Sequence, residues 1–284
     1  MTYVWTKRCL PEEESAWHTK LELLGINTLV ATTIRRQKMV RLEVYSDFSK
    51  IPDQLLKLFG GTLTKLKDQN WAALGDQRPI ELKIRDRLFI TSESDTTKLS
   101  KLRKTHSQLR VLSIPPELAF GTGDHATTAN CLRLLVDIAK ERHGSKWSML
   151  DLGTGTGVLA IAAKALDAHK VEGWENDPLA IDVAKRNVLA NGFEAKAIPI
   201  RKRDVLILKT NRPTLDVIVA NLFSEILIAI FPKIRQALKP NGTLVISGIL
   251  DHQAEGVFAA AKNSGFTFST IKQRGPWIAA RTSD

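Results

Sequence analysis

The segment Met149-Leu150-Asp151-Leu152-Gly153-Thr154-Gly155-Thr156-Gly157 decides the fold class of this chain. It is typical of a short buried strand that runs into a glycine loop, and the apolar residues 158–166 predict a helix directly after the loop. Glycines let the backbone approach a ligand closely, and the N-terminus of the following helix offers partial positive charge to a carboxylate or a phosphate. The segment therefore predicts a nucleotide-type site.

Strands and helices alternate on the C-terminal side of Pro115-Pro116, as in a parallel sheet with helices on both faces. The pattern predicts an α/β fold of the Rossmann-like type. Strands are expected at residues 148–152, 170–175, 197–200, 216–221, 243–249, 266–271 and 277–280, and helices at 158–166, 178–190, 225–238 and 253–263.

The first 66 residues predict a smaller α+β domain. An amphipathic helix is expected at residues 11–24, which start with Pro and a run of Glu, and a second one at 51–59. With strands around them, this order fits a ferredoxin-like β-α-β-β-α-β domain. We therefore divide the chain into a ferredoxin-like domain (1–66), a linker with short strands (67–116) and a catalytic domain (117–284).

The expected linker carries five cations and no acid between Thr96 and Arg110. A phosphate-binding loop is one interpretation, but a solvated basic loop is favoured, because no aromatic residue is interleaved for stacking on bases. The cations are Lys98, Lys101, Arg103, Lys104 and Arg110.

Length and composition exclude several classes of protein. The 284 residues suggest about two domains, and 43% hydrophobic with 25% charged residues is ordinary for a globular chain. The most apolar run, residues 226–231, is far shorter than the roughly 18 residues of a membrane span, and the first residues lack the apolar core of a signal peptide. We expect a cytoplasmic monomer. The net charge of +11 favours polyanionic partners or acidic surfaces without naming one.

An acidic residue follows the second expected strand of the catalytic domain. Glu175 lies 22 residues beyond Gly153, and its carboxylate can accept hydrogen bonds from two ribose hydroxyls. That geometry serves S-adenosylmethionine or NAD equally, because Gly155-x-Gly157-x-x-Ala160 also satisfies the dinucleotide fingerprint. Asp177 is expected to cap the helix that starts at Pro178 rather than to bind a ligand.

Two further segments favour a methyl donor over a dinucleotide. Upstream, Leu118-Ala119-Phe120-Gly121-Thr122-Gly123-Asp124-His125-Ala126-Thr127-Thr128 is a second loop rich in Gly and Thr. Downstream, Asn221-Leu222-Phe223 places an amide side chain at the carboxyl edge of the sheet, where open α/β folds bind their ligands. We therefore expect both loops to face one cleft.

These motifs resemble the PrmA family, the methyltransferases of ribosomal protein eleven of the large subunit. The resemblance covers most of the chain, and it implies a class I S-adenosylmethionine-dependent methyltransferase domain behind a small ferredoxin-like domain for substrate recognition. It also implies methylation of amino groups, on lysine side chains or the N-terminal α-amine, of a large-subunit ribosomal protein. The implied cofactor-binding residues are Phe120, Thr127, Thr128, Gly153, Gly155, Glu175 and Asn221, with Asn221 also catalytic.

The chain departs from the family pattern at three places. Asp124 stands where Thr is usual, Ala126 where Pro is usual, and Leu222-Phe223-Ser224 where Ile-Leu-Ala is common. These departures bear on the substrate more than on the cofactor. His125 is interpreted as ordering its loop by hydrogen bonding rather than as a base, because methyl transfer to a neutral amine needs little base catalysis.

Three alternatives stay open at this point. An RNA methyltransferase fits the charge of +11, but the Asn-Pro-Pro-Tyr type of tetrapeptide is absent. An NAD-dependent oxidoreductase fits the glycine loop and Glu175 but not the second loop. A module that binds the cofactor without catalysis is the third. Cys9 and Cys131 lie far apart without Cys-x-x-Cys spacing, and the six histidines are dispersed, so the sequence supports no metal site.

Overall fold

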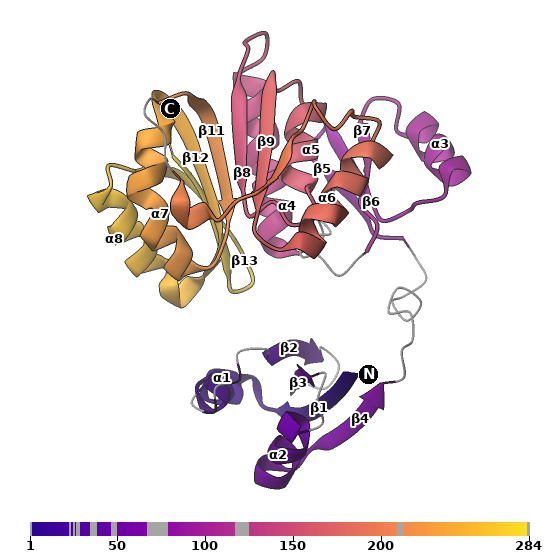
Figure 1. Cartoon of the computed structure of the whole chain (residues 1–284), viewed down its shortest axis with the longest axis vertical. Coiled ribbons are helices and arrows are strands. Elements are labelled where there is room, and N and C mark those ends of the chain that lie inside the picture. Colours follow the sequence, from indigo (N-terminus) through magenta and orange to yellow (C-terminus); the bar gives the residue numbers. More distant parts are fainter. Residues whose placement is uncertain are drawn as a thin grey trace. The chain divides into compact units, whose positions relative to one another are not determined.

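The computed structural model describes residues 2–22, 24, 26, 29–34, 39–46, 50–66, 79–116, 125–208 and 213–282. The chain forms two compact units, Met1–Gln77 and Arg78–Asp284, which we describe one at a time (Figure 1).

The first unit is a four-stranded antiparallel sheet with two helices. Its sheet has the order β2-β3-β1-β4. Trp5, Leu42 and Leu55 are fully buried between sheet and helices, and the Trp5 Nε1 donates a hydrogen bond to the Gly60 carbonyl at 2.8 Å. The elements are β1 (Thr2–Cys9), the 3-10 turn η1 (Pro11–Glu13), α1 (Glu14–Glu22), β2 (Leu29–Ile34), β3 (Met39–Ser46), α2 (Lys50–Phe59) and β4 (Thr62–Leu66). This is the ferredoxin-like arrangement predicted from the sequence.

The second unit is built on a seven-stranded sheet of order β10-β9-β8-β11-β12-β14-β13. The first five strands in this order are parallel, whereas β14 pairs antiparallel with both β12 and β13. The strands are β8 (Ser148–Leu152), β9 (Lys170–Glu175), β10 (Ile200–Lys202), β11 (Leu215–Asn221), β12 (Leu238–Leu250), β13 (Phe268–Arg274) and β14 (Trp277–Thr282). The antiparallel hairpin distinguishes this sheet from the dinucleotide-binding order 3-2-1-4-5-6.

Alternate side chains of the strands pack into two separate cores, one on each face of the large sheet. On β8, Met149 belongs to the core beneath α4 (Ala126–Glu141), α5 (Val158–Ala165) and α6 (Pro178–Ala190), whereas Leu150 belongs to the core beneath α7 (Ser224–Ala237) and α8 (Ala254–Asn263). Figure 1 shows these two groups of helices on either side of the sheet. The three-layer α/β fold predicted from the alternating pattern is confirmed.

The segment expected to be a linker contributes a small sheet to the second unit. Strands β5 (Glu81–Ile84), β6 (Leu88–Thr91) and β7 (Arg110–Ser113) pair in that order, and Ile84, Ile90 and Leu112 join the core beneath α4 and α5. The prediction of a basic loop between Thr96 and Arg110 was wrong, because Thr96–Thr105 form helix α3. The Asp95 carboxylate caps this helix by accepting from the Lys98 amide at 2.9 Å, and Leu99 is buried.

No helix among the described residues combines the length and the apolar character needed to cross a bilayer.

Candidate functional site

A cavity of about 380 Å³ lies at the carboxyl edge of the large sheet. From β8 the chain adds β9 and β10 on one side of the sheet, and it then returns to add β11 and β12 on the other side. The boundary between β8 and β11 is therefore a topological switch point, where open α/β folds bind their ligands. Residues that follow β8, β9 and β11, together with residues of β12 and β14, line this cavity. They are His125, Thr127, Thr128, Gly153, Thr154, Gly155, Val158, Leu159, Glu175, Asn221, Leu222, Phe223, Ile226, Gly248 and Trp277.

The glycine loop leaves β8 with a backbone that only glycine adopts without strain. Gly153 has a φ of 72° and Gly157, the N-cap of α5, has a φ of 82°. A Cβ on Gly153 would also lie 2.4 Å from Leu222 Cδ2. The loop that follows β11 thus packs directly against the loop that follows β8. This contact fixes the position of the glycine loop in the lining of the cavity.

Glu175, at the end of β9, holds the glycine loop from the other side. Its Oε2 accepts a hydrogen bond from the Gly155 amide at 3.0 Å, and its Oε1 accepts from the amides of Asn176 and Asp177 at 2.8 and 3.2 Å. A carboxylate has about four acceptor positions, so three are already used by the backbone. Asp177 caps α6 by accepting from the Leu179 amide at 2.9 Å, which confirms its assignment as a cap.

Two polar segments that are far apart in the sequence meet in the lining of the cavity. The Nδ2 of Asn221, the last residue of β11, donates to Thr127 Oγ1 at 3.3 Å and to Thr128 Oγ1 at 3.4 Å. Both threonines lie in the first turn of α4 and are buried. Because Nδ2 is held by the threonines, the carbonyl Oδ1 of Asn221 is the atom that can accept a hydrogen bond from a ligand.

His125 is tied into its own loop. Its Nδ1 lies 2.8 Å from Thr127 Oγ1, and its ring packs edge-on against Trp277 with 5.1 Å between the ring centroids. The hydrogen bond joins His125, the N-cap residue of α4, to the first turn of that helix, and the loop it was expected to order lies outside the described residues. Trp277 begins β14, so the antiparallel hairpin supplies one wall of the cavity.

Asp151 is fully buried in β8 beneath the glycine loop. Its pKa is raised to about 7, mainly by burial and with a smaller contribution from the nearby Glu175 carboxylate, against the opposing effect of the hydrogen bond that Thr154 Oγ1 donates to Oδ2 at 2.6 Å. Among the described residues its Oδ1 has no hydrogen-bond partner. This carboxyl therefore titrates near neutral pH, inside the element that shapes the site.

Three helices begin at this cavity, which gives it a favourable field for an anion. His125, Gly157 and Phe223 are the N-caps of α4, α5 and α7. His125 and Phe223 line the cavity, and so does Val158, the first residue of α5. A helix N-terminus carries about half a positive charge and unpaired backbone N–H groups. A carboxylate near the helix ends and a ribose near Glu175 would both be accommodated.

All but one of the candidate binding residues surround this one cavity. The exception is Phe120, which lies outside the described residues, as does Asp124. The residues that line the cavity are Thr127, Thr128, Gly153, Gly155, Glu175 and Asn221. Their roles toward a ligand stay predictions.

The sequence reasoning missed Gly248 and Trp277 as residues of the site. Gly248 has a φ of 86°, and a Cβ there would lie 2.4 Å from the Leu222 carbonyl oxygen, so this glycine lets the loop after β11 pass close to β12. An isolated glycine within an apolar strand pattern is the signal that was available for it.

The described residues contain no group of three or more His, Cys, Asp or Glu side chains placed to hold a metal ion. Cys9 and Cys131 are free thiols, both buried, and burial raises the pKa of Cys131 to about 12. Both therefore serve as small core residues.

The sheet order and the position of the cavity define the class of this protein as a class I, Rossmann-like methyltransferase. A crystal structure described as a ribosomal protein L11 methylase from Lactobacillus delbrueckii subsp. bulgaricus superposes with a TM-score of 0.54 and 28% identity, covering 61% of this chain and 84% of that one. The fold class expected from the sequence is confirmed.

The chain belongs to the PrmA family. The family model described as ribosomal protein L11 methyltransferase matches residues 9–283. A relative of that name from Desulforapulum autotrophicum is 31% identical over 240 residues, covering 83% of this chain and 74% of the relative. Another, from Heliobacterium modesticaldum, is 37% identical over 170 residues, covering 60% of this chain and about half (51%) of the relative.

Proposed function

We propose that this chain transfers the methyl group of S-adenosylmethionine to an amino nitrogen of a large-subunit ribosomal protein. The observation that carries the proposal is the contact of Asn221 with Thr127 and Thr128 in the lining of the cavity that the glycine loop also lines. The names of the relatives support the substrate class. A substrate of this kind places the activity in the cytoplasm.

The residues present fit the cofactor. Glu175 would hold the ribose, the N-termini of α4, α5 and α7 would hold the carboxylate, and the apolar Val158 and Leu159 would line the remaining surface. A volume of about 380 Å³ lies at the lower end of the range for small-molecule sites, which suits one nucleoside better than the two of a dinucleotide. When bound, S-adenosylmethionine supplies a methyl group made electrophilic by its sulfonium.

Asn221 would orient the nitrogen of the substrate. Its Nδ2 is anchored by two threonine hydroxyls, so its Oδ1 accepts a hydrogen bond from the amine and directs the nitrogen lone pair. Such alignment converts a bimolecular step into an effectively intramolecular one, an effect of up to roughly 7–11 kcal/mol.

The substrate amine must lose its proton before it can react. For a lysine of pKa near 10.4 this costs about 4.6 kcal/mol at pH 7, and for an α-amine near 7.8 about 1 kcal/mol. Desolvation against the apolar wall of Leu222, Phe223 and Ile226 lowers the pKa of either amine and so reduces this cost. The ferredoxin-like unit would recognise the substrate protein.

The proposed activity is tested with the purified chain, radiolabelled S-adenosylmethionine, and a mixture of large-subunit ribosomal proteins and ribosomal RNA. We expect label on a protein, with mass spectrometry locating the added methyl groups on amino nitrogens. Label on RNA alone, or binding of the cofactor without transfer to any protein, would contradict the proposal. Tight binding of NAD in place of S-adenosylmethionine would contradict it as well.

The ribose assignment is tested by Glu175→Ala and Glu175→Gln. Both variants remove the carboxylate, but Gln keeps an acceptor for the Gly155 amide and thus preserves the loop. We expect S-adenosylmethionine affinity to fall at least tenfold in Ala and less in Gln, measured by calorimetric titration. Unchanged affinity in both variants would refute the assignment.

A further inference from the structure

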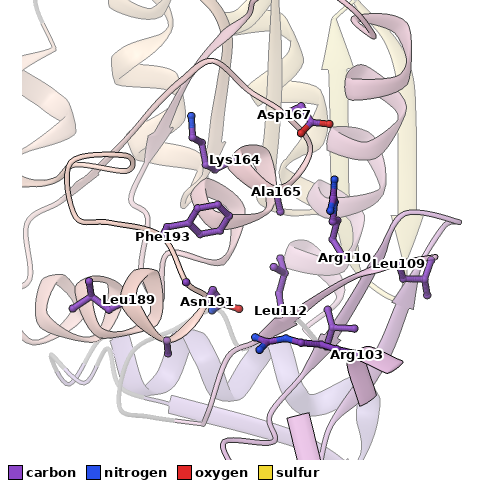
Figure 2. Close-up of a pocket in the computed structure, with 13 residues that line it drawn as sticks. Arg103, Leu109, Arg110, Leu112, Lys164, Ala165, Asp167, Leu189, Asn191 and Phe193 are labelled. Carbon is purple, nitrogen blue, oxygen red and sulfur yellow. The ribbon is translucent and has the colours of Figure 1, made fainter. Parts of the chain in front are cut away.

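A second hollow, of about 570 Å³, lies in the second unit near the C-terminal ends of α5 and α6 (Figure 2). It is separate from the cavity described above, with which it shares no lining residue. Its walls come from α3, β7 and the segments that follow α5 and α6. They consist of Arg103, Leu109, Arg110, Val111, Leu112, Lys164, Ala165, Asp167, Leu189, Ala190, Asn191, Gly192 and Phe193.

Two arginines of this hollow are exposed and uncommitted. Neither Arg103 nor Arg110 makes a side-chain hydrogen bond or an ion pair within the part of the chain that the structure describes. They come from the basic run that the sequence singled out, in which Lys101 and Lys104 of α3 are also exposed. A guanidinium presents a planar fork of donors that matches a phosphate group.

The other charges of the hollow are already balanced. Helices α5 and α6 end here, and helix C-termini carry partial negative charge. Lys164 binds the carbonyls of Ala168 and His169 at 3.1 and 3.0 Å, just beyond the end of α5. Lys164 also offsets the single acid, Asp167. The two arginines therefore leave an excess of positive charge.

The fold supplies the aromatic side chain that the basic run lacks in sequence. Phe193, half-buried in the segment after α6, lines the same hollow as the two arginines, and Leu189, which is 60% exposed, lies beside it. Figure 2 shows Arg103 and Arg110 on one side of the hollow and Phe193 and Lys164 on the other. An aromatic face opposite guanidinium groups is the arrangement that holds a base and its phosphates.

We propose that this hollow binds single-stranded nucleic acid, with phosphates on Arg103 and Arg110 and a base against Phe193. The exposed Lys101 and Lys104 extend the basic surface along α3 for neighbouring phosphates. A single strand is required because the bases of a duplex are stacked on one another and offer no free face. The volume of the hollow exceeds what a lone phosphate occupies and suits a nucleotide. This inference does not depend on the proposed methyl transfer.

The test uses the full chain and a fluorescein-labelled single-stranded RNA of 12 nucleotides, with binding followed by anisotropy from low to physiological salt. In the double variant Arg103→Gln/Arg110→Gln we expect affinity to fall about tenfold or more. We also expect the slope of log K against log salt to become shallower by about 1.4, since each phosphate contact with a single strand contributes about 0.7.

The matched control is Lys262→Gln/Lys272→Gln, which removes the same charge from α8 and β13, at the opposite end of the seven-stranded sheet from β10. We expect this control to bind like the wild type. Equal losses in both double variants would overturn the proposal, because binding would then follow net charge alone. An unchanged affinity in the arginine variant, folded by circular dichroism, would overturn it too. The single variant Arg110→Gln serves if the double variant is unstable.

Phe193→Leu tests the base contact, because leucine keeps apolar packing but removes the aromatic face. We expect it to weaken binding of the single strand severalfold, while the weak binding of a 12-base-pair duplex stays the same. Equal affinity of the wild type for duplex and single strand, together with no effect of Phe193→Leu, would overturn the proposal.

Discussion

The two ends of helix α5 border two different cavities, whose charged side chains have opposite signs. At its N-terminus, backbone N–H groups face a cavity whose charged side chain is an acid, Glu175. At its C-terminus, the end of the helix faces a hollow with the cations Arg103, Arg110 and Lys164. Each end thus has side chains of the sign that complements the helix dipole. The difference teaches that one helix in a parallel α/β layer can border two sites whose charged side chains have opposite signs.

The largest expected effect concerns catalysis at the first of these ends. Asn221→Ala removes the proposed acceptor for the substrate amine, and we expect kcat to fall about 10²- to 10³-fold, the loss typical when one preorganised polar contact is deleted. The affinity for S-adenosylmethionine should change less than tenfold. Single-turnover kinetics and cofactor titration measure the two quantities, and a loss confined to cofactor affinity would show that Asn221 does not orient the substrate.

A pair of glycine substitutions compares the backbones of the two surfaces. Gly153 (φ 72°) and Gly192 (φ 80°) both have left-handed conformations, but a Cβ on Gly153 meets Leu222 Cδ2 whereas one on Gly192 meets nothing within 4 Å. We expect Gly192→Ala to cost about 1–2 kcal/mol from backbone strain alone, and Gly153→Ala to cost about 3 kcal/mol. Urea denaturation measures both. Equal losses of unfolding free energy in the two variants would mean that Leu222 and the loop after β11 move aside without cost.

Gly153→Ala should also weaken cofactor binding, because Leu222 and its neighbour Asn221 must shift. Gly192→Ala should leave cofactor binding as it is.

The buried Asp151 predicts a pH dependence of stability that originates at the first surface. Its pKa of about 7 in the folded chain lies above the value near 3.9 of an unfolded chain, so the folded state binds the proton more tightly. The stability that the neutral carboxyl contributes is complete below about pH 4 and is lost as pH rises toward 7, by up to about 1.4 kcal/mol per pH unit. Asp151→Asn should remove this slope in urea titrations between pH 4 and 7. An identical slope in the variant would assign it to other groups.

The smallest expected effect concerns the rim of the first cavity. Phe223 is 71% exposed although its loop is held by a hydrogen bond from the Leu222 amide to the Ser247 carbonyl at 3.0 Å. An exposed aromatic ring on a fixed backbone offers a contact for the stem or the cationic head of a substrate amine. We expect Phe223→Ala to raise KM for the protein substrate about tenfold, with a smaller fall in kcat because part of the desolvating apolar wall is lost, and with cofactor affinity unchanged. Phe223→Tyr should restore KM. An unaltered KM in the alanine variant would exclude the contact.

Helix α6 and helix α3 show what the sequence reveals and what it hides. The bounds of α6 follow from local signals, because Asp177 caps it, Pro178 occupies its first position and Gly192 lies just beyond its end. Helix α3 has no periodic pattern of apolar residues that would mark it in the sequence, because its single buried residue, Leu99, lies among cations. Its packing against the small sheet, which includes the unanticipated strand β7, makes it a helix.

The candidate site divides in the same way. The glycine loop, Glu175 and Asn221 follow strands that the pattern identifies, and parallel strands bring their carboxyl ends to one edge. Trp277 could not be placed at the site from sequence, because its position depends on β14 pairing antiparallel with β12. Phe193 is likewise separated from Arg110 by more than eighty residues, and only the tertiary fold makes them neighbours.

Glu175 accepts hydrogen bonds from three backbone amides in the absence of a ligand, and this affects how it selects between nucleosides. A ribose diol needs two acceptor positions and finds one unused, so it must displace a backbone bond as it enters. A nucleoside with only one of the two hydroxyls can use the free acceptor position without displacing a backbone amide, so the second hydroxyl adds less to the affinity than a full hydrogen bond. The hydrogen bonds to Glu175 also hold the glycine loop in its conformation before the ligand binds. The loss of conformational entropy of this loop therefore accompanies folding and does not reduce the affinity for the ligand.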